Sequence, residues 1–153
     1  MFRVREAKPS EIQTVKLLDK KTVWEQMERE ERDLIEDFDR YHDEFWRRMT
    51  ESKGTAFYVA VDSEGGVVGM VWVSISDRIS GVRFGWIHDI TVDEKFRGRG
   101  IGRMLLQHAV EHFKAIGIRM IGLMVLVDNQ SARELYAGEG FHDYSVYMLK
   151  TLE

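Results

Sequence analysis

A glycine-rich stretch between an expected strand and an expected helix, residues 90–106 (ITVDEKFRGRGIGRMLL), constrains this chain more than any other feature. Its three glycines fall where the helix must begin. Because glycine has no Cβ, several backbone N–H groups there can converge on one anion, and the helix dipole points its positive end at the same place. The stretch therefore predicts a phosphate-binding loop at a helix N-terminus. The glycines are Gly98, Gly100 and Gly102, and the flanking arginines are Arg97, Arg99 and Arg103.

The spacing of these residues decides between kinds of phosphate loop. The chain lacks three residues of the P-loop pattern, and its glycines run G-x-G-x-G rather than the G-x-G-x-x-G of a dinucleotide site. A plain tight turn is the remaining structural alternative. The spacing of Arg97, Gly100 and Gly102, after a strand ending in Val92 and before a leucine-containing helix, resembles the acetyl-CoA pyrophosphate loop of the GNAT family of N-acetyltransferases.

A second stretch, residues 127–141 (VDNQSARELYAGEGF), strengthens this resemblance. Asn129 and Tyr136 are two helical turns apart, so they share one helix face, with the small Ala132 between them. N-x-x-A-x-x-x-Y followed shortly by Gly-Phe resembles the second cofactor segment of the same family. The order of elements fits over the whole chain, and the motifs are specific from about Ile87 to Phe141.

The predicted fold is α/β: one domain, residues 1–153, with a single mixed and mainly antiparallel sheet flanked by helices, as in the acyl-CoA N-acyltransferase fold. Ser10 is a candidate N-cap for the first helix, and a break is expected between Glu28 and Asp33. The remaining predicted elements are strands at 55–61, 67–75 and 82–92, a helix at 100–115 ended by Gly117, a fully covered strand at 120–127, a helix from Asn129 to about Gly138, and a last strand at 141–149.

Composition excludes several kinds of protein. With no cysteine, the chain has no structural disulfide, no thiolate zinc site and no cysteine nucleophile. No apolar run is long enough to span a membrane and residues 1–10 are charged, so we expect a cytoplasmic protein without membrane association. Residues 25–44 hold ten acidic and three basic residues, which leaves the glycine-loop end basic. This uneven distribution argues against a nucleic-acid partner, and exposed strand edges allow a homodimer without requiring one.

The family resemblance implies a role for each motif residue. Acetyl-CoA would be the co-substrate, with no metal. The backbone of residues 97–103 would hold the pyrophosphate, and the strand before it would pair with the pantetheine arm and polarise the thioester carbonyl. Tyr136 would protonate the leaving thiolate, which suits a phenol that is neutral at pH 7. The implied cofactor-binding residues are Ile90, Thr91, Val92, Arg97, Gly98, Arg99, Gly100, Ile101, Gly102, Arg103, Asn129 and Tyr136.

The base that accepts the amine proton is expected just before this strand end, at His88 or Asp89. Neighbouring residues of a regular strand face opposite sides, so only one of the two is expected to point into the cleft. An unperturbed histidine titrates near neutral pH, which favours His88, with Asp89 structural. The alternative is a strand histidine without a proton role.

Two further patterns bear on function. His108 and His112 form the H-x-x-E-H pattern of some zinc proteases, but no third ligand is evident and the helix grows out of the phosphate loop. Met124 stands where related N-terminal protein acetyltransferases carry a glutamate base. We therefore predict transfer of an acetyl group to a primary amine, favouring a small cationic one. A protein lysine or N-terminal acetyltransferase and a CoA-binding regulatory module without turnover are the alternatives.

Overall fold

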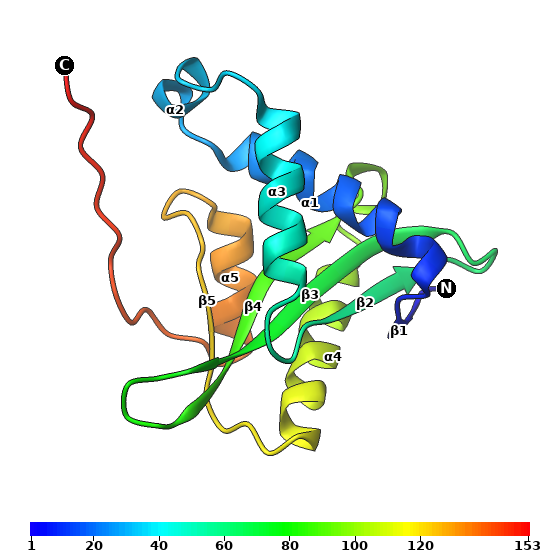
Figure 1. Ribbon diagram of the computed structural model, residues 1–153. Helices are drawn as coiled ribbons and strands as arrows, with labels where there is room; N and C mark the ends of the chain where they lie inside the picture. The colour runs from blue at the N-terminus through cyan, green and yellow to red at the C-terminus, as the bar shows by residue number, and fades with distance from the viewer.

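A five-stranded sheet runs through the centre of the computed structural model, which describes residues 1–153 (Figure 1). The strands lie in chain order, antiparallel except for the parallel last pair. This confirms the predicted mixed, mainly antiparallel sheet. The strands are β1 (Arg3–Glu6), β2 (Ala56–Val61), β3 (Val67–Asp77), β4 (Arg83–Val92) and β5 (Ile121–Leu123).

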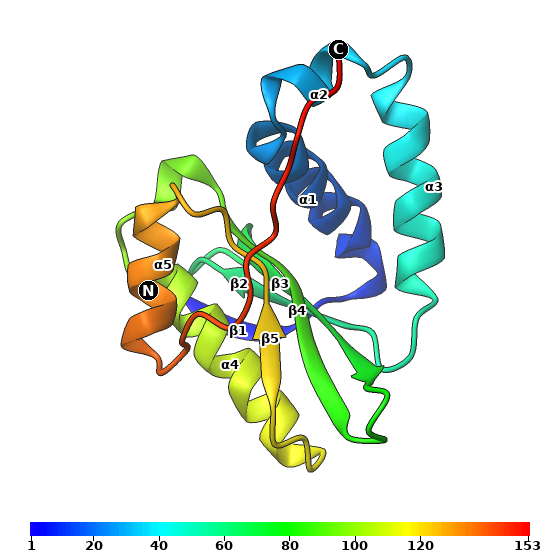
Figure 2. The ribbon, with the colours of Figure 1, turned by 90° about the vertical axis from the view of Figure 1, so that its left-hand side faces the viewer.

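Helices cover both faces of the sheet (Figure 2). On one face, Val15 and Trp46 pack against Trp72. On the other, Phe113 packs with the apolar side chains of β3 and β4. No helix combines the length and apolar character that crossing a membrane requires. The helices are α1 (Ile12–Gln26), α2 (Arg29–Asp33), α3 (Phe38–Thr50), α4 (Ile101–Ala115) and α5 (Gln130–Gly138), with short 3₁₀ turns η1 (Pro9–Glu11) and η2 (Glu94–Phe96).

The start of the first helix differs from the prediction. Ser10 lies inside the 3₁₀ turn, and the N-cap of α1 is Glu11, which makes no side-chain capping bond to the helix. The Glu11 carboxylate instead receives both terminal N–H groups of Arg5, at 2.8 and 2.9 Å, and the backbone N–H of Lys8. Charge-assisted bonds of this kind are stronger than a hydroxyl cap, so this carboxylate fixes the turn from β1 into α1.

The helical region before β2 is interrupted near the expected break between Glu28 and Asp33. Helix α1 continues to Gln26, the short α2 fills the expected break, and α3 follows. Arg32 of α2 reaches back and donates to the carbonyl of Trp24 at 2.6 Å, which closes the end of α1.

Near the C-terminus, one predicted strand is shorter and more exposed than expected, and another is wrong. The apolar run 120–127 forms only the three-residue β5, and Met124 and Val127 are 67% and 75% exposed. Residues 141–149 form no strand. A strand needs a neighbour for its backbone groups, and in this chain the outer edge of β5 is not paired with this segment. The other predicted strands, the helix ending before Gly117 and the helix after Asn129 are confirmed within about two residues.

Candidate active site

A β-bulge in β4 shapes the site. Trp72 of β3 pairs with Asp89, whereas the next residue, Val73, pairs with Ile87, so His88 is the extra residue. An extra residue breaks the alternation of side chains along a strand. His88 and Asp89 consequently lie on the same face of the sheet and both line the pocket, so the prediction that they face opposite sides is wrong.

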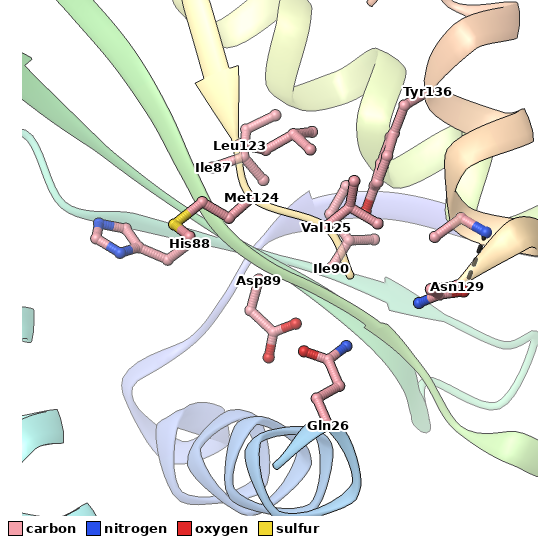
Figure 3. Close-up of a pocket in the computed structure, with 11 residues that line it drawn as sticks. Gln26, Ile87, His88, Asp89, Ile90, Leu123, Met124, Val125, Asn129 and Tyr136 are labelled. Carbon is pink, nitrogen blue, oxygen red and sulfur yellow. Dashed lines mark hydrogen bonds between the residues drawn. The ribbon is translucent and has the colours of Figure 1, made fainter. Parts of the chain in front are cut away.

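The His88 ring lies against the sheet. It stacks on Trp72 with centroids 4.4 Å apart, and its Nε2 is 2.6 Å from the Ser74 hydroxyl. Burial lowers the pKa of His88, which favours the neutral imidazole. In Figure 3 the ring points to the side of the pocket away from Tyr136. The Ser74 hydroxyl already occupies Nε2 of His88.

Asp89 ends a chain of buried polar groups. Thr91 donates its single hydroxyl proton to Asp89 Oδ1 at 3.0 Å, so Thr22, whose hydroxyl is 2.7 Å from that of Thr91, must donate to Thr91. The other oxygen, Oδ2, is buried without a hydrogen-bond partner. Burial raises the pKa of Asp89 well above its usual value, and the neighbouring carboxyl of Asp19 raises it further.

Asp19 and His42 form a buried pair behind Asp89. Asp19 Oδ2 of α1 is 2.9 Å from His42 Nε2 of α3, and their side chains are almost fully buried. Because a charged or polar group inside a protein is costly without a partner, this pair ties the two helices together at the site. It also places a titratable carboxyl next to Asp89.

Helix α5 brings two more polar groups to the pocket. Burial raises the pKa of Tyr136 to about 12, with the charge of Asp89 adding to the rise, so the phenol stays protonated at neutral pH. Asn129 Oδ1 accepts the backbone N–H of Ala132 at 3.3 Å and caps α5. In Figure 3, Asp89 and Tyr136 approach the pocket from opposite sides of Ile90.

The pocket lies where β4 and β5 separate. These strands pair only between Gly85–Ile87 and Ile121–Leu123, so the backbone of residues 88–92 has no strand partner on that side. An extended ligand has room to pair with this free edge. The lining residues are Gln26, Ile87, His88, Asp89, Ile90, Leu123, Met124, Val125, Asn129, Ala132 and Tyr136 (Figure 3).

The glycine loop supplies free donors beside this edge. Gly98 and Gly100 have φ values of +77° and +79°, in the left-handed region that favours glycine, and Gly100 is the N-cap of α4. None of the backbone N–H groups of residues 98–103 donates to another backbone group. These free N–H groups at the positive end of α4 form an arrangement suited to an anion.

The three arginines of the loop already have partners. Arg97 donates to the carbonyl of Val92 at 3.2 Å, and Arg99 lies over the Phe96 ring at 5.3 Å. Arg103 is 3.5 Å from the Glu139 carboxylate. Arg97 therefore links the loop to the end of β4, and all three side chains keep positive charge around the loop.

His108 and His112 lie elsewhere, on the face of α4 that packs against β2. His112 Nδ1 is 2.7 Å from the Tyr58 hydroxyl, and both imidazole rings pack on the Tyr58 ring. Neither histidine lines the pocket.

Asp19 and His42 are not among the residues predicted for the site. Each has a detectable signal, because each lies four residues from a buried apolar residue on its own helix: Asp19 from Val15 and His42 from Trp46. A charged or polar residue at the helical spacing of a core face points to a buried, partnered group.

Known proteins with similar sequences are named as acetyltransferases. A model of the acetyltransferase (GNAT) family matches residues 21–141. The chain is 47% identical over 60 residues to an uncharacterized N-acetyltransferase of Methanocaldococcus jannaschii, across 39% of this chain and 26% of that protein. It is 34% identical over 83 residues to the mycothiol acetyltransferase of Propionibacterium freudenreichii, across 54% of this chain and 26% of that protein. The chain thus spans about a quarter of the length of these two relatives.

A solved structure resembles the chain over its whole length. The putative acetyl transferase from Pyrococcus furiosus superposes with a TM-score of 0.84 at 26% identity, covering 99% of this chain and all of the other. This similarity confirms the acyl-CoA N-acyltransferase fold. The family model covers more than half of the chain and includes both the glycine loop and the helix that carries Tyr136. The chain belongs to the acetyltransferase (GNAT) family.

Proposed function

We propose that the chain transfers an acetyl group from acetyl-CoA to a primary amine that attacks directly. One observation carries the proposal: a single pocket holds a carboxyl with a free oxygen, Asp89, and a protonated phenol, Tyr136, on opposite sides of an unpaired stretch of β4. A base and an acid so placed are what transfer to an amine requires. Without a cysteine, the chain has no thiol to carry the acetyl group.

The free donors of the glycine loop support acetyl-CoA as co-substrate. The unpaired N–H groups of residues 98–103 suit a pyrophosphate, and the free edge at Ile90–Val92 suits an extended amide-containing arm. When bound, acetyl-CoA supplies the acetyl group as a thioester. The Asn129 amide nitrogen, which has no hydrogen-bond partner in the chain, is a further group that would hold it, with the loop arginines Arg97, Arg99 and Arg103 around the phosphates.

We assign the base role to Asp89 in preference to His88. Asp89 Oδ2 has no partner and its raised pKa makes the carboxylate a stronger base. The Nε2 of His88 is engaged by Ser74, so His88 is the second candidate. In the proposed reaction the amine nitrogen bonds to the acetyl carbon, Asp89 takes the proton from that nitrogen, and Tyr136 gives its own proton to the departing sulfur. Exchange with water then restores both residues.

The acceptor side of the pocket favours a small cationic amine. Gln26 lines the pocket at the end of α1, and the acidic segment of residues 25–44 begins beside it. Glu28, Glu31 and Glu36 of this segment are exposed, so their charge attracts a cation before it binds. Met124 also lines the pocket and has no group that accepts a proton.

The test is release of free thiol from acetyl-CoA over a panel of amines and peptides. We expect turnover with small cationic amines and a rise in melting temperature with acetyl-CoA alone, since a ligand that binds the folded state stabilises it. Turnover with peptides only would mean that the acceptor is a protein and not a small amine. A thermal shift without turnover on any acceptor would make the chain a CoA-binding module, and no shift at all would refute the loop assignment.

A further inference from the structure

The last twelve residues form an extended tail with no place on the sheet. No backbone hydrogen bond involves residues 142–153. The apolar side chains of this tail are exposed, from 68% at Leu149 to 86% at Met148. Figure 1 shows the tail, in red, leaving the base of α5 and running along the outside of the molecule, apart from β5.

The tail has the pattern of a strand that is covered on both faces. Tyr144, Val146 and Met148 alternate along one side, and Tyr147 and Leu149 lie on the other. A run of this length with apolar residues on both sides is unusual on a protein surface, where it favours association. From Ser145 onward, the side chains make no hydrogen bond, ion pair or aromatic contact in the chain.

The outer edge of β5 offers backbone groups that another strand could pair with. β5 is the last strand of the sheet, so one of its edges is open. The open run continues past the strand: Met124 and Val127 are exposed, and no backbone hydrogen bond reaches Met124, Val125 or Val127. An open edge of this kind is a template for another strand.

We propose that two copies of the chain exchange their tails, so that residues 144–152 of each copy pair with the run 120–127 of the other. The chain carries both the unpaired strand and the open edge, and a two-fold arrangement satisfies both at once in each copy. Twelve extended residues reach about 40 Å, enough to cross to a neighbouring copy. The tail is anchored at its start, where Arg133 holds Asp143 at 2.8 Å and the Phe141 N–H bonds the Tyr136 carbonyl.

The exchange bears on the active site because Met124 and Val125 of the open run also line the pocket. A partner tail on this edge would border the pocket on its β5 side. The proposed exchange goes beyond the proposed acetyl transfer, because the pairing depends only on the tail and the edge and not on the identity of the acceptor.

The first test is the mass of the full chain in solution by sedimentation or light scattering. We expect a dimer, and we expect the double variant Val146→Asp, Met148→Asp to be monomeric with an unchanged circular dichroism spectrum, because these side chains are 78% and 86% exposed in their own chain. The matched control is Leu17→Glu, an exposed apolar residue of α1, which should remain dimeric. A monomeric native chain, or a dimer that persists in the tail variant, overturns the proposal.

A crosslinking test separates exchange from a tail that folds back on its own sheet. The chain has no cysteine, so single cysteines can be placed without background. Val127→Cys chains are mixed with a set carrying one cysteine at Tyr144, Val146 or Met148, then oxidised. Exchange predicts a disulfide between the two different chains. If instead the double variants, with Val127→Cys and a tail cysteine in one chain, crosslink only within a monomer, the tail pairs with its own edge and the proposal fails.

Discussion

The bulge at His88 is the single-residue feature on which the site depends. Ile87 and Ile90 are three residues apart, yet both pack on the α4 side of the sheet. In a regular strand, residues with this spacing face opposite sides. The extra residue lets both isoleucines remain in the apolar core while His88 and Asp89 face the pocket, so no charged group is forced among apolar side chains.

Tyr136→Phe tests the proposed acid. The variant keeps the ring but loses the only proton that the phenol can donate, so we expect kcat to fall by about 100-fold with little change in melting temperature. Steady-state thiol release measures this. Tyr58→Phe is the matched control, a phenol that bonds His112 outside the pocket, and its kcat should stay at the native value. Equal kcat in native and Tyr136→Phe proteins would refute the acid role.

Asp19→Asn tests the proposed base through the pH profile. A base must be unprotonated, so the rate falls as pH drops through the pKa of Asp89, which Asp19 raises. Removing the Asp19 carboxylate lowers the pKa of Asp89, and we expect the acid limb of kcat/KM to move to lower pH. Asn retains an oxygen that can accept from His42.

The control for that shift is Asp39→Asn, an exposed carboxylate of α3 paired with Lys20, which should leave the acid limb in place. Because Asp19 also raises the pKa of His88, the second arm is His88→Ala. An acid limb that is lost in His88→Ala would transfer the base role to His88, and a limb that His88→Ala leaves in place supports Asp89.

Among the elements, the glycine loop combines a left-handed backbone with the proposed pyrophosphate site. Gly100→Ala forces a side chain into the left-handed region at φ +79°, although the added Cβ would meet nothing within 4 Å. We expect about 1–2 kcal/mol loss in the free energy of unfolding, together with a higher KM for acetyl-CoA. Chemical denaturation and steady-state kinetics measure the two effects.

Gly81→Ala is the matched control, since this glycine also has a positive φ, +83°, with nothing within 4 Å, but lies in the β3–β4 turn. It should lose similar stability without a change in KM. If both variants raise KM equally, the effect of Gly100→Ala comes from general destabilisation and not from the loop.

The junction of β1 and α1 should make stability depend on pH. The Arg5 guanidinium lowers the pKa of Glu11 from 4.5 to about 2. A lowered folded-state pKa means that this carboxylate adds stability above pH 4.5 and loses it as pH falls toward 2. Native protein should therefore exceed Glu11→Gln in free energy of unfolding above pH 4.5, and the difference should disappear near pH 2. The exposed Glu64→Gln should show no such pH-dependent difference.

The whole molecule is divided by charge: residues 25–44 are acidic, and the glycine loop after β4 is basic. Gln26 of the acidic segment lines the pocket. Replacing Glu28, Glu31 and Glu36 by Gln should raise KM for a cationic amine several-fold at low salt and little at high salt. The reason is that screening lengths fall from about 30 Å at 0.01 M salt to about 3 Å at 1 M.

A matched triple variant tests whether the change in KM depends on the position of the replaced glutamates or on the net charge of the protein. Replacing Glu51, Glu64 and Glu111 by Gln changes the net charge equally but alters exposed sites outside the acidic segment. Its KM should follow the native value at both salt concentrations. Identical behaviour of the two triple variants would remove any role for the acidic segment in acceptor binding.

By itself, the sequence determined the features that depend on neighbouring residues. The positive φ values of Gly98, Gly100 and Gly117, the hairpin of β2 and β3, and the helices that follow the glycine loop and Asn129 all follow from local backbone preferences and short-range apolar patterns. Among them, the glycine loop and the helix after Asn129 form the proposed cofactor side, and the sequence predicts both.

Only the tertiary structure decided the proposed acceptor side and the state of the C-terminal segment. The bulge at His88 is a difference in register between two strands, and the Asp19–His42 pair joins two helices through residues 23 positions apart in the chain. The segment 141–149 has the composition of a strand but no partner within the chain. Register, burial of a charged pair and strand pairing are each set by residues distant in sequence, so the local pattern at any one of these positions does not contain them.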